Sequence, residues 1–327
     1  MDCFAIAMPE IAPQAPGVRR LASIPEISQL GAPAHLALGV FDGVHLGHQA
    51  VIGRAVASAR EGGGLAGVLT FDPNPLRVLA PEKAPARLLA SLDHKAEILG
   101  PLGVDFLVAL PFDRERARDE AHDFIRELVT SGCATLVSGE DWRFGRDRRG
   151  GRGLLQRMAG EMGFTFHAIP PVMMDGERIS STRIRQAVRD ANLDAAERML
   201  GRRYTVQGRV IRGRELGRKL GFPTANLEPG EEQYPADGVW AVRAKVRGEW
   251  HRGVANLGTR PTVGGEGRQL EVHLLDFSGD LYGEVIEVDW VRRLRGEKRF
   301  NNLEELAAAI EVDRAAAAVC LDTVKEA

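Results

Sequence analysis

The stretch GVFDGVHLGH, residues 39–48, decides how the first half of the chain is interpreted. It lies between the apolar run HLAL (35–38) and QAVIGRAVASAREGG (49–63), a boundary typical of a strand that passes into a helix. The imidazoles of His45 and His48 therefore stand at the start of a predicted helix. Metal binding, phosphate binding and plain packing are three explanations of that position.

Phosphate binding has clear physical support at this turn. A helix N-terminus offers unpaired N–H groups and a partial positive charge, and Gly43 and Gly47 let a ligand approach the backbone closely. A metal site would need a third ligand, which no nearby motif supplies. From the spacing alone, packing or surface histidines stay open.

The rest of the first half alternates apolar runs with helix-period stretches such as AHDFIRELV (121–129) and GLLQRMAGEMG (153–163). The apolar runs are LALGVF (36–41), GLAGVLTF (64–71), DFLVALPF (105–112), ATLVSG (134–139) and FHAIPPV (166–172). Continuous apolar strands separated by helices predict an α/β domain with a parallel sheet covered on both faces. Ligands of such sheets bind at the carboxyl ends of the strands, where GVFDGVHLGH lies.

From Tyr204 onward, segments of period two predict an antiparallel barrel or sandwich. In VWAVRAKV (239–246) the apolar side chains alternate with Arg and Lys, and in VIEVDWV (285–291) they alternate with Glu287 and Asp289. The chain closes with a predicted helix, LEELAAAIEVDRAAAAVCL (303–321), which Asn302 and Glu305 would cap as a pair.

Length and composition bound the remaining possibilities. The chain has 327 residues, with 43 Lys and Arg against 45 Asp and Glu, so two domains are expected and binding of long nucleic acid is not. No apolar run is long enough to cross a membrane, and the N-terminus lacks the basic segment of a secretory signal. Three scattered cysteines indicate reduced thiols. We expect a cytoplasmic protein whose partners are small molecules, with no nucleic acid and no membrane; homo-oligomer formation stays open.

Two further stretches favour phosphate. GEDWRFGRDRRGG (139–151) sets four arginines among glycines, and in RISSTRIR (178–185) Arg183 and Arg185 follow three hydroxyl side chains. A Ser-Ser-Thr run before a helix is also a good N-cap, but the arginines exceed what capping requires.

The order GxFDGVHxGH, FDPxP, GxDxRFG and RISSTxIR resembles the FMN adenylyltransferase module of bacterial FAD synthetases over residues 35–185. That module is a Rossmann-like HxGH nucleotidyltransferase, in which the two histidines contact the ATP phosphates and the ISSTxIR segment binds the leaving pyrophosphate. The resemblance assigns Gly39, Phe41, Asp42, Gly43, His45, His48, Ser181, Thr182 and Arg185 to ATP, and Asn74, Asp141 and Arg178 to the flavin.

Two positions depart from the family pattern. Asn74 stands where FDPxP usually has histidine, and Trp142 stands where phenylalanine is usual. Asn74 keeps a hydrogen-bonding group, so we expect reduced activity or altered FMN binding rather than loss of the chemistry. A phosphate monoester has a second pKa of about 6, so FMN arrives as a nucleophile that needs alignment and charge neutralisation rather than a strong base.

In the second half, GRKLGFPTANL (217–227) is conspicuous. Propensity favours a turn entering a strand, but Thr224 and Asn226 would point to the same side of an extended segment, where both oxygens can reach a Mg²⁺. Glu271 would begin the apolar face of a strand that continues through His273, Leu275 and Phe277. An inward acid needs a reason, and the simplest is a rim glutamate paired with an arginine.

The segments GRxLGFPTANL, GVWA, GVANLGTRPTV, LEVHLLDFSGDLYGE and RGEKRF resemble bacterial riboflavin kinases over residues 200–305. Trp240 replaces the tyrosine usual there. The resemblance implies that Thr224 and Asn226 hold Mg²⁺-ATP and that Glu271 deprotonates the ribityl hydroxyl, as an alcohol requires. It assigns Gly221, Pro223, Thr224 and Asn226 to ATP and Arg295 and Glu297 to the flavin.

Together the motifs predict a bifunctional enzyme that makes FMN and then FAD, with Mg²⁺ and ATP. The expected limits are 15–186 for the adenylyltransferase, 187–203 for a linker and 204–327 for a barrel with a terminal helix. Two alternatives stay open, an active kinase with an impaired adenylyltransferase and a non-catalytic flavin-binding regulator. An HxGH aminoacyl-tRNA synthetase fragment is disfavoured because no KMSKS-like loop and no basic surface accompany the motif.

Overall fold

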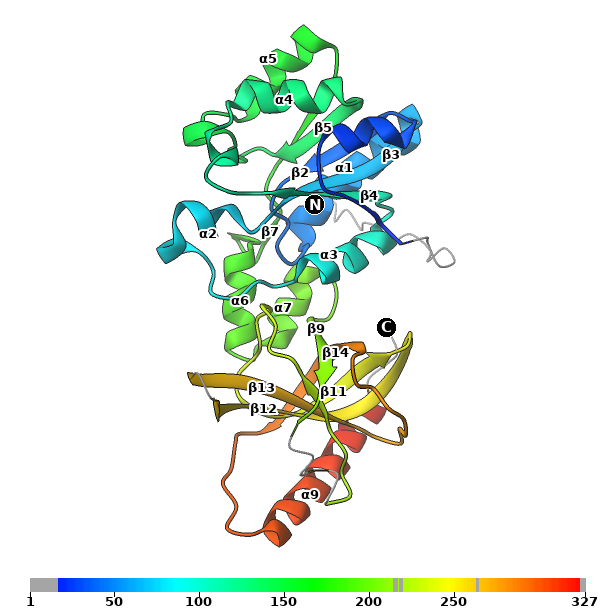
Figure 1. The fold of residues 1–327 in the computed structure, drawn as a ribbon, viewed down its shortest axis with the longest axis vertical. Helices are drawn as coiled ribbons and strands as arrows, with labels where there is room; N and C mark the ends of the chain where they lie inside the picture. Colours follow the sequence, from blue (N-terminus) through cyan, green and yellow to red (C-terminus); the bar gives the residue numbers. More distant parts are fainter. Residues whose placement is uncertain (1–16, 214–216, 218–219, 263–264, 324–327) are drawn as a thin grey trace. The chain divides into compact units, whose positions relative to one another are not determined.

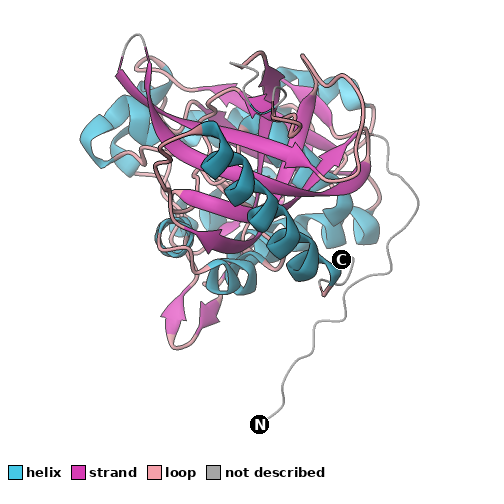
Figure 2. Cartoon of the chain, turned by 90° about the horizontal axis from the view of Figure 1, so that it is seen from below, coloured by secondary structure: helices cyan, strands magenta, loops and turns pink. Residues whose placement is uncertain are grey.

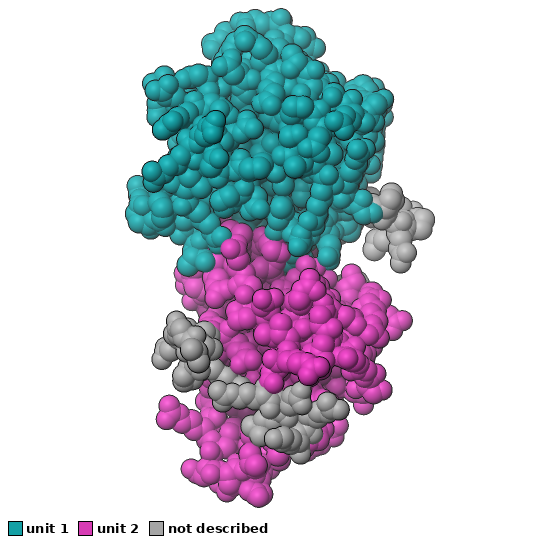
Figure 3. Space-filling view, in the orientation of Figure 1, with its two compact units in different colours: residues 1–86, 92–178 teal, residues 87–91, 179–327 magenta. Residues whose placement is uncertain are grey.

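The computed structural model describes residues 17–213, 217, 220–262 and 265–323. The chain divides into two compact units, coloured separately in Figure 3. Unit 1 consists of Met1–Ala86 and Leu92–Arg178, and unit 2 of Arg87–Ser91 and Ile179–Ala327. The N-terminal residues in which a signal sequence was sought lie outside the described residues, as do Arg218 and Lys219 of the GRKLGFPTANL motif.

Unit 1 is built on a six-stranded sheet with strand order β1-β4-β3-β2-β5-β6, and every neighbouring pair is parallel. Figure 1 labels its four central strands, β2 to β5. The strands are β1 (Arg19–Leu21), β2 (Ala34–Leu38), β3 (Leu65–Asp72), β4 (Phe106–Pro111), β5 (Cys133–Gly139) and β6 (Thr165–Ile169). The helices are α1 (Leu46–Gly62), α2 (Pro75–Leu79), α3 (Leu92–Leu99), α4 (Ala121–Thr130) and α5 (Arg152–Met162). The predicted parallel α/β domain is thus confirmed.

The central strand β2 shows why the runs of this half are continuously apolar. Leu36 and Leu38 pack in one hydrophobic cluster with residues of α4 and α5. Ala37 packs in a second cluster with residues of α1 and α3. All five residues of β2 are buried, because helices cover both faces of the sheet. A short hairpin of β7 (Met173–Met174) and β8 (Glu177–Arg178) follows β6.

Unit 2 contains a closed antiparallel barrel with strand order β10-β13-β12-β11-β14-β9, in which β9 pairs back to β10. Its strands are β9 (Thr205–Ile211), β10 (Ala225–Leu227), β11 (Gly238–Val246), β12 (Glu249–Thr262), β13 (Gly265–Leu274) and β14 (Val285–Arg295). Val242, Ala244 and Val246 are buried, whereas Arg243 and Lys245 between them are partly exposed. The predicted barrel is confirmed, and its period of two reflects an apolar interior.

Helices complete unit 2. α6 (Ser181–Arg189) and α7 (Leu193–Leu200) precede the barrel, and α9 (Leu303–Asp322) lies across the outer face of β11, β12 and β14 (Figure 2). Asn302 caps α9 as predicted, since its side chain accepts a hydrogen bond of 2.8 Å from the Glu305 N–H. The segment Arg87–Ser91 belongs to unit 2 because Leu88 exchanges backbone hydrogen bonds with Glu231 and Gln233.

Candidate functional site

The turn between β2 and α1 presents the two predicted histidines side by side. His45 is the N-cap of α1, and its Nδ1 accepts a hydrogen bond of 3.3 Å from the backbone N–H of His48. The two rings stack with centroids 3.5 Å apart and planes 18° from parallel. One histidine is therefore engaged in capping, which the packing explanation predicts, and it holds the second in a fixed orientation.

His48 carries the ligand-binding potential of this turn. Burial, then the neighbouring His45, Lys95 and Arg178, hold its pKa well below its usual value, so the ring is neutral at neutral pH. Phe41 packs edge-on against the ring at 5.3 Å. Its buried Nδ1 has no hydrogen-bond partner within the described part of the chain. A buried polar atom without a partner is costly, and a bound phosphate would satisfy it.

The backbone of this turn is strained. Phe41, Gly43 and Val44 have φ angles of 51°, 79° and 43°, and for the two residues other than glycine this left-handed region is unfavourable. The Val40 carbonyl accepts hydrogen bonds from the Thr70 hydroxyl at 2.8 Å and from Lys95 Nζ at 2.9 Å. No sequence motif pointed to Lys95, which is 6% exposed and lies on α3.

The residues that the motifs assign to flavin binding in the adenylyltransferase interact with neighbouring groups of the protein. Asp141 and Arg178 form an ion pair, and a hydrogen bond from Arg178 is the main cause that lowers the pKa of Asp141. Asn74 caps α2, since its Oδ1 accepts a hydrogen bond of 3.0 Å from the Leu76 N–H.

A cavity of about 270 Å³ opens near these residues. Its walls include five aromatic side chains, of which Trp142 and Phe144 stack at 4.4 Å. These aromatic residues are Phe71, Phe112, Phe124, Trp142 and Phe144. Flat apolar walls suit an aromatic ring system, and of these residues only Trp142 stood out in the sequence, as a departure from a site motif.

The RISSTRIR motif forms the start of α6 in unit 2. Ser180, rather than Ser181 or Thr182, is the N-cap, and its hydroxyl accepts a hydrogen bond of 3.3 Å from the Arg183 N–H. Arg185 Nη2 lies 3.5 Å from the Thr182 hydroxyl. One hydroxyl therefore performs the capping, and Ser181, Thr182 and Arg185 lie together on the first two turns of the helix.

In the barrel, Asn226, Glu271 and Asn256 are direct neighbours on three adjacent strands. Glu271 of β13 pairs with Asn226 of β10 on one side and with Asn256 of β12 on the other. Side chains of directly opposite residues share one face of a sheet. Asn256 belongs to the motif GVANLGTRPTV (253–263), but the motif alone predicted no role for this residue.

The predicted apolar face of β13 was wrong. Leu270, Val272 and Leu274 are the buried side of the strand, with exposures of 1%, 0% and 7%. Glu271 and His273 therefore lie on the outer face of the barrel and line a cavity beneath α9. The prediction counted the apolar Leu275 and Phe277 as part of the strand. However, β13 ends at Leu274, before a turn in which Asp276 has a φ of 56°.

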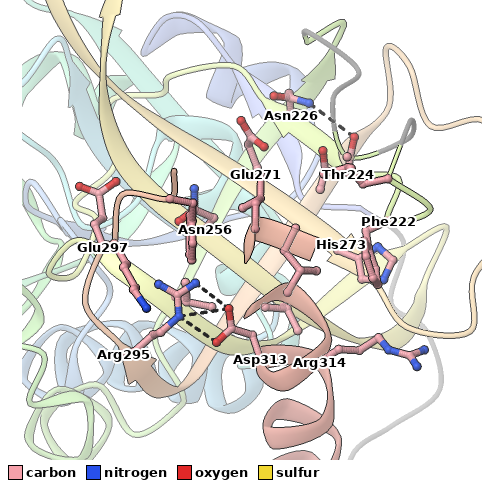
Figure 4. A pocket seen from close by; sticks show the side chains of 18 residues that line it. Phe222, Thr224, Asn226, Asn256, Glu271, His273, Arg295, Glu297, Asp313 and Arg314 are labelled. Carbon is pink, nitrogen blue, oxygen red and sulfur yellow. Dashed lines mark hydrogen bonds and ion pairs between the residues drawn. The ribbon is translucent and has the colours of Figure 1, made fainter. Parts of the chain in front are cut away.

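The cavity beneath α9 has a volume of about 280 Å³ (Figure 4). Thr224, Asn226 and Glu271 lie at one end, and Thr224 and Asn226 also line an adjoining cavity of about 530 Å³. Two adjoining cavities that share a hydroxyl and an amide could receive two substrates, and the shared side chains would lie between them.

The loop before β10 is fixed to β13. The Pro223 carbonyl accepts a hydrogen bond of 2.8 Å from His273 Nδ1, and Phe222 packs edge-on against the same ring. Gly221 has a φ of +87°, a left-handed backbone conformation that residues with a side chain rarely adopt. These contacts hold Thr224 and Asn226 toward the cavity.

Arg295 and Glu297 lie at the other end of the same cavity. Figure 4 shows Arg295 directed at Asp313 of α9, with which it makes hydrogen bonds of 2.9 Å and 2.7 Å. Asp313 was not predicted as a site residue. A buried acid on a predicted amphipathic helix gives no signal until its partner, 18 positions earlier in the chain, is known.

Among the described residues, no group of three His, Cys, Asp or Glu could hold a metal ion. A zinc site at His45 and His48 therefore has no third ligand there. The oxygens of Thr224 and Asn226 suit Mg²⁺, which keeps several waters and binds substrate phosphates instead of an all-protein cage. In the described part of the chain, no helix is both long and apolar enough to span a membrane.

Two family models together match most of the chain. The model described as FAD synthetase matches residues 28–183, and the model described as riboflavin kinase matches residues 200–321.

Curated relatives match both halves at once. The Pseudomonas fluorescens protein is 43% identical, over 86% of this chain and 90% of its own length. The Escherichia coli K12 protein is 44% identical, over 85% of this chain and 90% of its own. The Bacillus subtilis protein is 36% identical, over 88% of this chain and 92% of its own. Each carries the name bifunctional riboflavin kinase/FMN adenylyltransferase.

A solved structure from Streptococcus pneumoniae is similar over 92% of this chain and 99% of its own, with a TM-score of 0.77 and 29% identity. It is described as a macrolide-efflux protein.

Proposed function

The chain belongs to the family of bifunctional riboflavin kinase/FMN adenylyltransferases, and we propose which residues carry its two reactions. The enzyme phosphorylates riboflavin with ATP to give FMN. It then transfers AMP from a second ATP to FMN, giving FAD and pyrophosphate. The barrel of unit 2 corresponds to the kinase, and the parallel sheet of unit 1 belongs to the adenylyltransferase.

Glu271 is the proposed base of the kinase reaction. An alcohol is protonated at neutral pH, so a positioned carboxylate that accepts its proton lowers the barrier to attack on the γ-phosphate. The observation that carries the assignment is the register of Glu271 with Asn226 and Asn256. Glu271 thereby lies at the end of the cavity beneath α9 where Thr224 lines both this cavity and the adjoining one.

The two adjoining cavities have separate proposed occupants. Riboflavin would enter the cavity beneath α9, where Arg295 and Glu297 lie at the far end. ATP would occupy the adjoining cavity, which Pro223 lines, so that its γ-phosphate reaches Thr224 and Asn226. Gly221 lies in the loop that precedes these residues. Mg²⁺, held by the oxygens of Thr224 and Asn226 and by phosphate, would neutralise the charge of the transferred group.

The adenylyltransferase needs neutralisation and alignment. The proposed contacts of the ATP phosphates are the N-terminus of α1 and Nδ1 of His48, which has no hydrogen-bond partner among the described residues; His45 orients His48. Gly39, Phe41, Asp42 and Gly43 shape the same turn. Ser181, Thr182 and Arg185 are the proposed contacts of the leaving pyrophosphate.

For the FMN of this second reaction, the cavity with aromatic walls is the proposed place of the flavin ring. The ion pair of Asp141 and Arg178 would border the flavin phosphate. Asn74, which stands where the family pattern usually has histidine, caps α2. We propose that it affects FMN binding through the position of that helix.

A time course with riboflavin and Mg²⁺-ATP tests both assignments, with flavins separated by chromatography. We expect FMN first and FAD second. Accumulation of FMN without FAD would favour the alternative of an impaired adenylyltransferase and make Asn74 the first suspect. Binding of flavin with neither product would favour a non-catalytic regulator.

A further inference from the structure

A buried lysine lies behind the strained turn of unit 1. Lys95 Nζ donates to the Val40 carbonyl at 2.9 Å and lies 3.3 Å from the Thr70 hydroxyl, which donates to the same carbonyl at 2.8 Å. Lys95 and Thr70 are 6% and 0% exposed. Two donors from α3 and β3 therefore converge on one carbonyl at the start of the turn.

A charged lysine buried this deeply is stable only if nearby groups offset the loss of its hydration. Burial lowers its pKa to about 8, and Asp42 of the turn and Asp72 at the end of β3 oppose that fall. His48 also faces this group, because Lys95 is one of the charges that lower the histidine's pKa. Lys95 is therefore mostly charged at neutral pH, and its charge is directed at the turn that carries the histidines.

The turn requires such support. Phe41 and Val44 adopt left-handed φ angles, and residues other than glycine persist in this unfavourable conformation only where the surrounding structure fixes them. Val40 directly precedes Phe41, so the clamp on its carbonyl fixes the backbone where the strain begins. The strained segment ends at His45, the N-cap of α1.

We propose that Lys95 is a positioning residue of adenylyl transfer, which, with Thr70, clamps the Val40 carbonyl and thereby sets His45 and His48 against ATP. The inference rests on the proposed phosphate role of these histidines. The competing explanation is that Lys95 only stabilises the fold of unit 1.

The test replaces Lys95 with methionine, which keeps most of the side-chain volume but removes the donors and the charge. We expect Lys95→Met to lower the kcat of FMN adenylylation by at least about tenfold, since small misplacement of catalytic groups is costly. The KM for FMN should change by less than about threefold. Riboflavin phosphorylation by the same protein should stay within about twofold, which serves as the internal control for folding. Lys83→Met, at an exposed position of the same unit, should change neither activity.

Two further measurements keep the inference testable if Lys95→Met folds poorly. Thr70→Val, which removes one donor, should lower the same kcat by a smaller factor. In the native enzyme, kcat for adenylylation should fall as pH rises through about 8, where Lys95 loses its proton. A flat profile between pH 7 and 9.5, or a normal kcat in Lys95→Met, would overturn the positioning role. A normal kcat in His48→Ala would instead overturn the phosphate role beneath it.

Discussion

Arg295 at the end of β14 and Asp313 of α9 form a bidentate ion pair at the edge of the cavity beneath α9. Arg295 Nε lies 2.9 Å from Asp313 Oδ1, and Arg295 Nη2 lies 2.7 Å from Asp313 Oδ2. Asp313 is 6% exposed. Further along α9, Ala317 and Leu321 pack on Ala241 of the barrel. The pair thus fixes the part of α9 that roofs the cavity, whereas apolar contacts fix the rest.

Removing one partner of this pair should affect riboflavin binding more than chemistry. We expect Asp313→Asn to raise the KM for riboflavin by about five- to tenfold with a smaller change in kcat, because the roof and Arg295 both lose their position. Steady-state kinetics of FMN formation measure this. Glu311→Gln removes an exposed ion pair with Arg314 on the same helix and should change neither constant. Equal effects of the two substitutions would contradict the role of Asp313.

Glu271→Gln separates the two reactions. The variant keeps the shape of the side chain but cannot accept the proton of the ribityl hydroxyl, so FMN formation should fall by a factor of about 100 or more. FAD formation from supplied FMN should be unchanged. Glu249→Gln, at an exposed position on the same barrel, is the matched control. If both reactions fall together in Glu271→Gln, the assignment of two sites is wrong.

His48→Ala should give the opposite result. Loss of the neutral imidazole removes a proposed partner of the ATP phosphates, and we expect FAD formation to fall by a factor of about 100 with riboflavin phosphorylation intact. The exposed His122 of α4 provides the control His122→Ala. Chromatography of flavins after incubation with FMN and ATP measures the first reaction. Normal FAD synthesis in His48→Ala would refute its phosphate role.

Both architectures could be predicted from the sequence because their signals are local. Continuous apolar runs indicate a sheet covered on two faces, and the period of two in VWAVRAKV (239–246) indicates a barrel wall. The face of Glu271 was mispredicted because Leu275 and Phe277 follow the end of β13 and continue its pattern only by chance. Lys95 and Asp313 could not be predicted, since a charged residue in a helix is normally exposed and their partners are distant in the chain.

Acid should destabilise unit 1 through His48. Its folded-state pKa lies well below its usual value, whereas in the unfolded chain it is about 6.5. Below that value the unfolded state binds a proton that the folded state refuses, so stability is present at neutral pH and is lost as pH falls from about 6.5. Thermal unfolding between pH 5 and 8 should show a steeper decline in the native protein than in His48→Gln. Parallel curves would contradict the buried neutral imidazole.

Removal of divalent metal tests the shared requirement of both reactions. With EDTA in excess we expect FMN formation and FAD formation to stop, because each transfers a group from a polyphosphate whose charge needs neutralisation. Mg²⁺ added back above the chelator should restore both. Thr224→Val, which removes one proposed oxygen ligand, should raise the Mg²⁺ concentration needed for the kinase while leaving that of the adenylyltransferase unchanged. If Thr224→Val raises the Mg²⁺ requirement of both reactions equally, Thr224 is not a ligand specific to the kinase. If FMN formation persists in EDTA, the kinase reaction does not depend on a divalent metal.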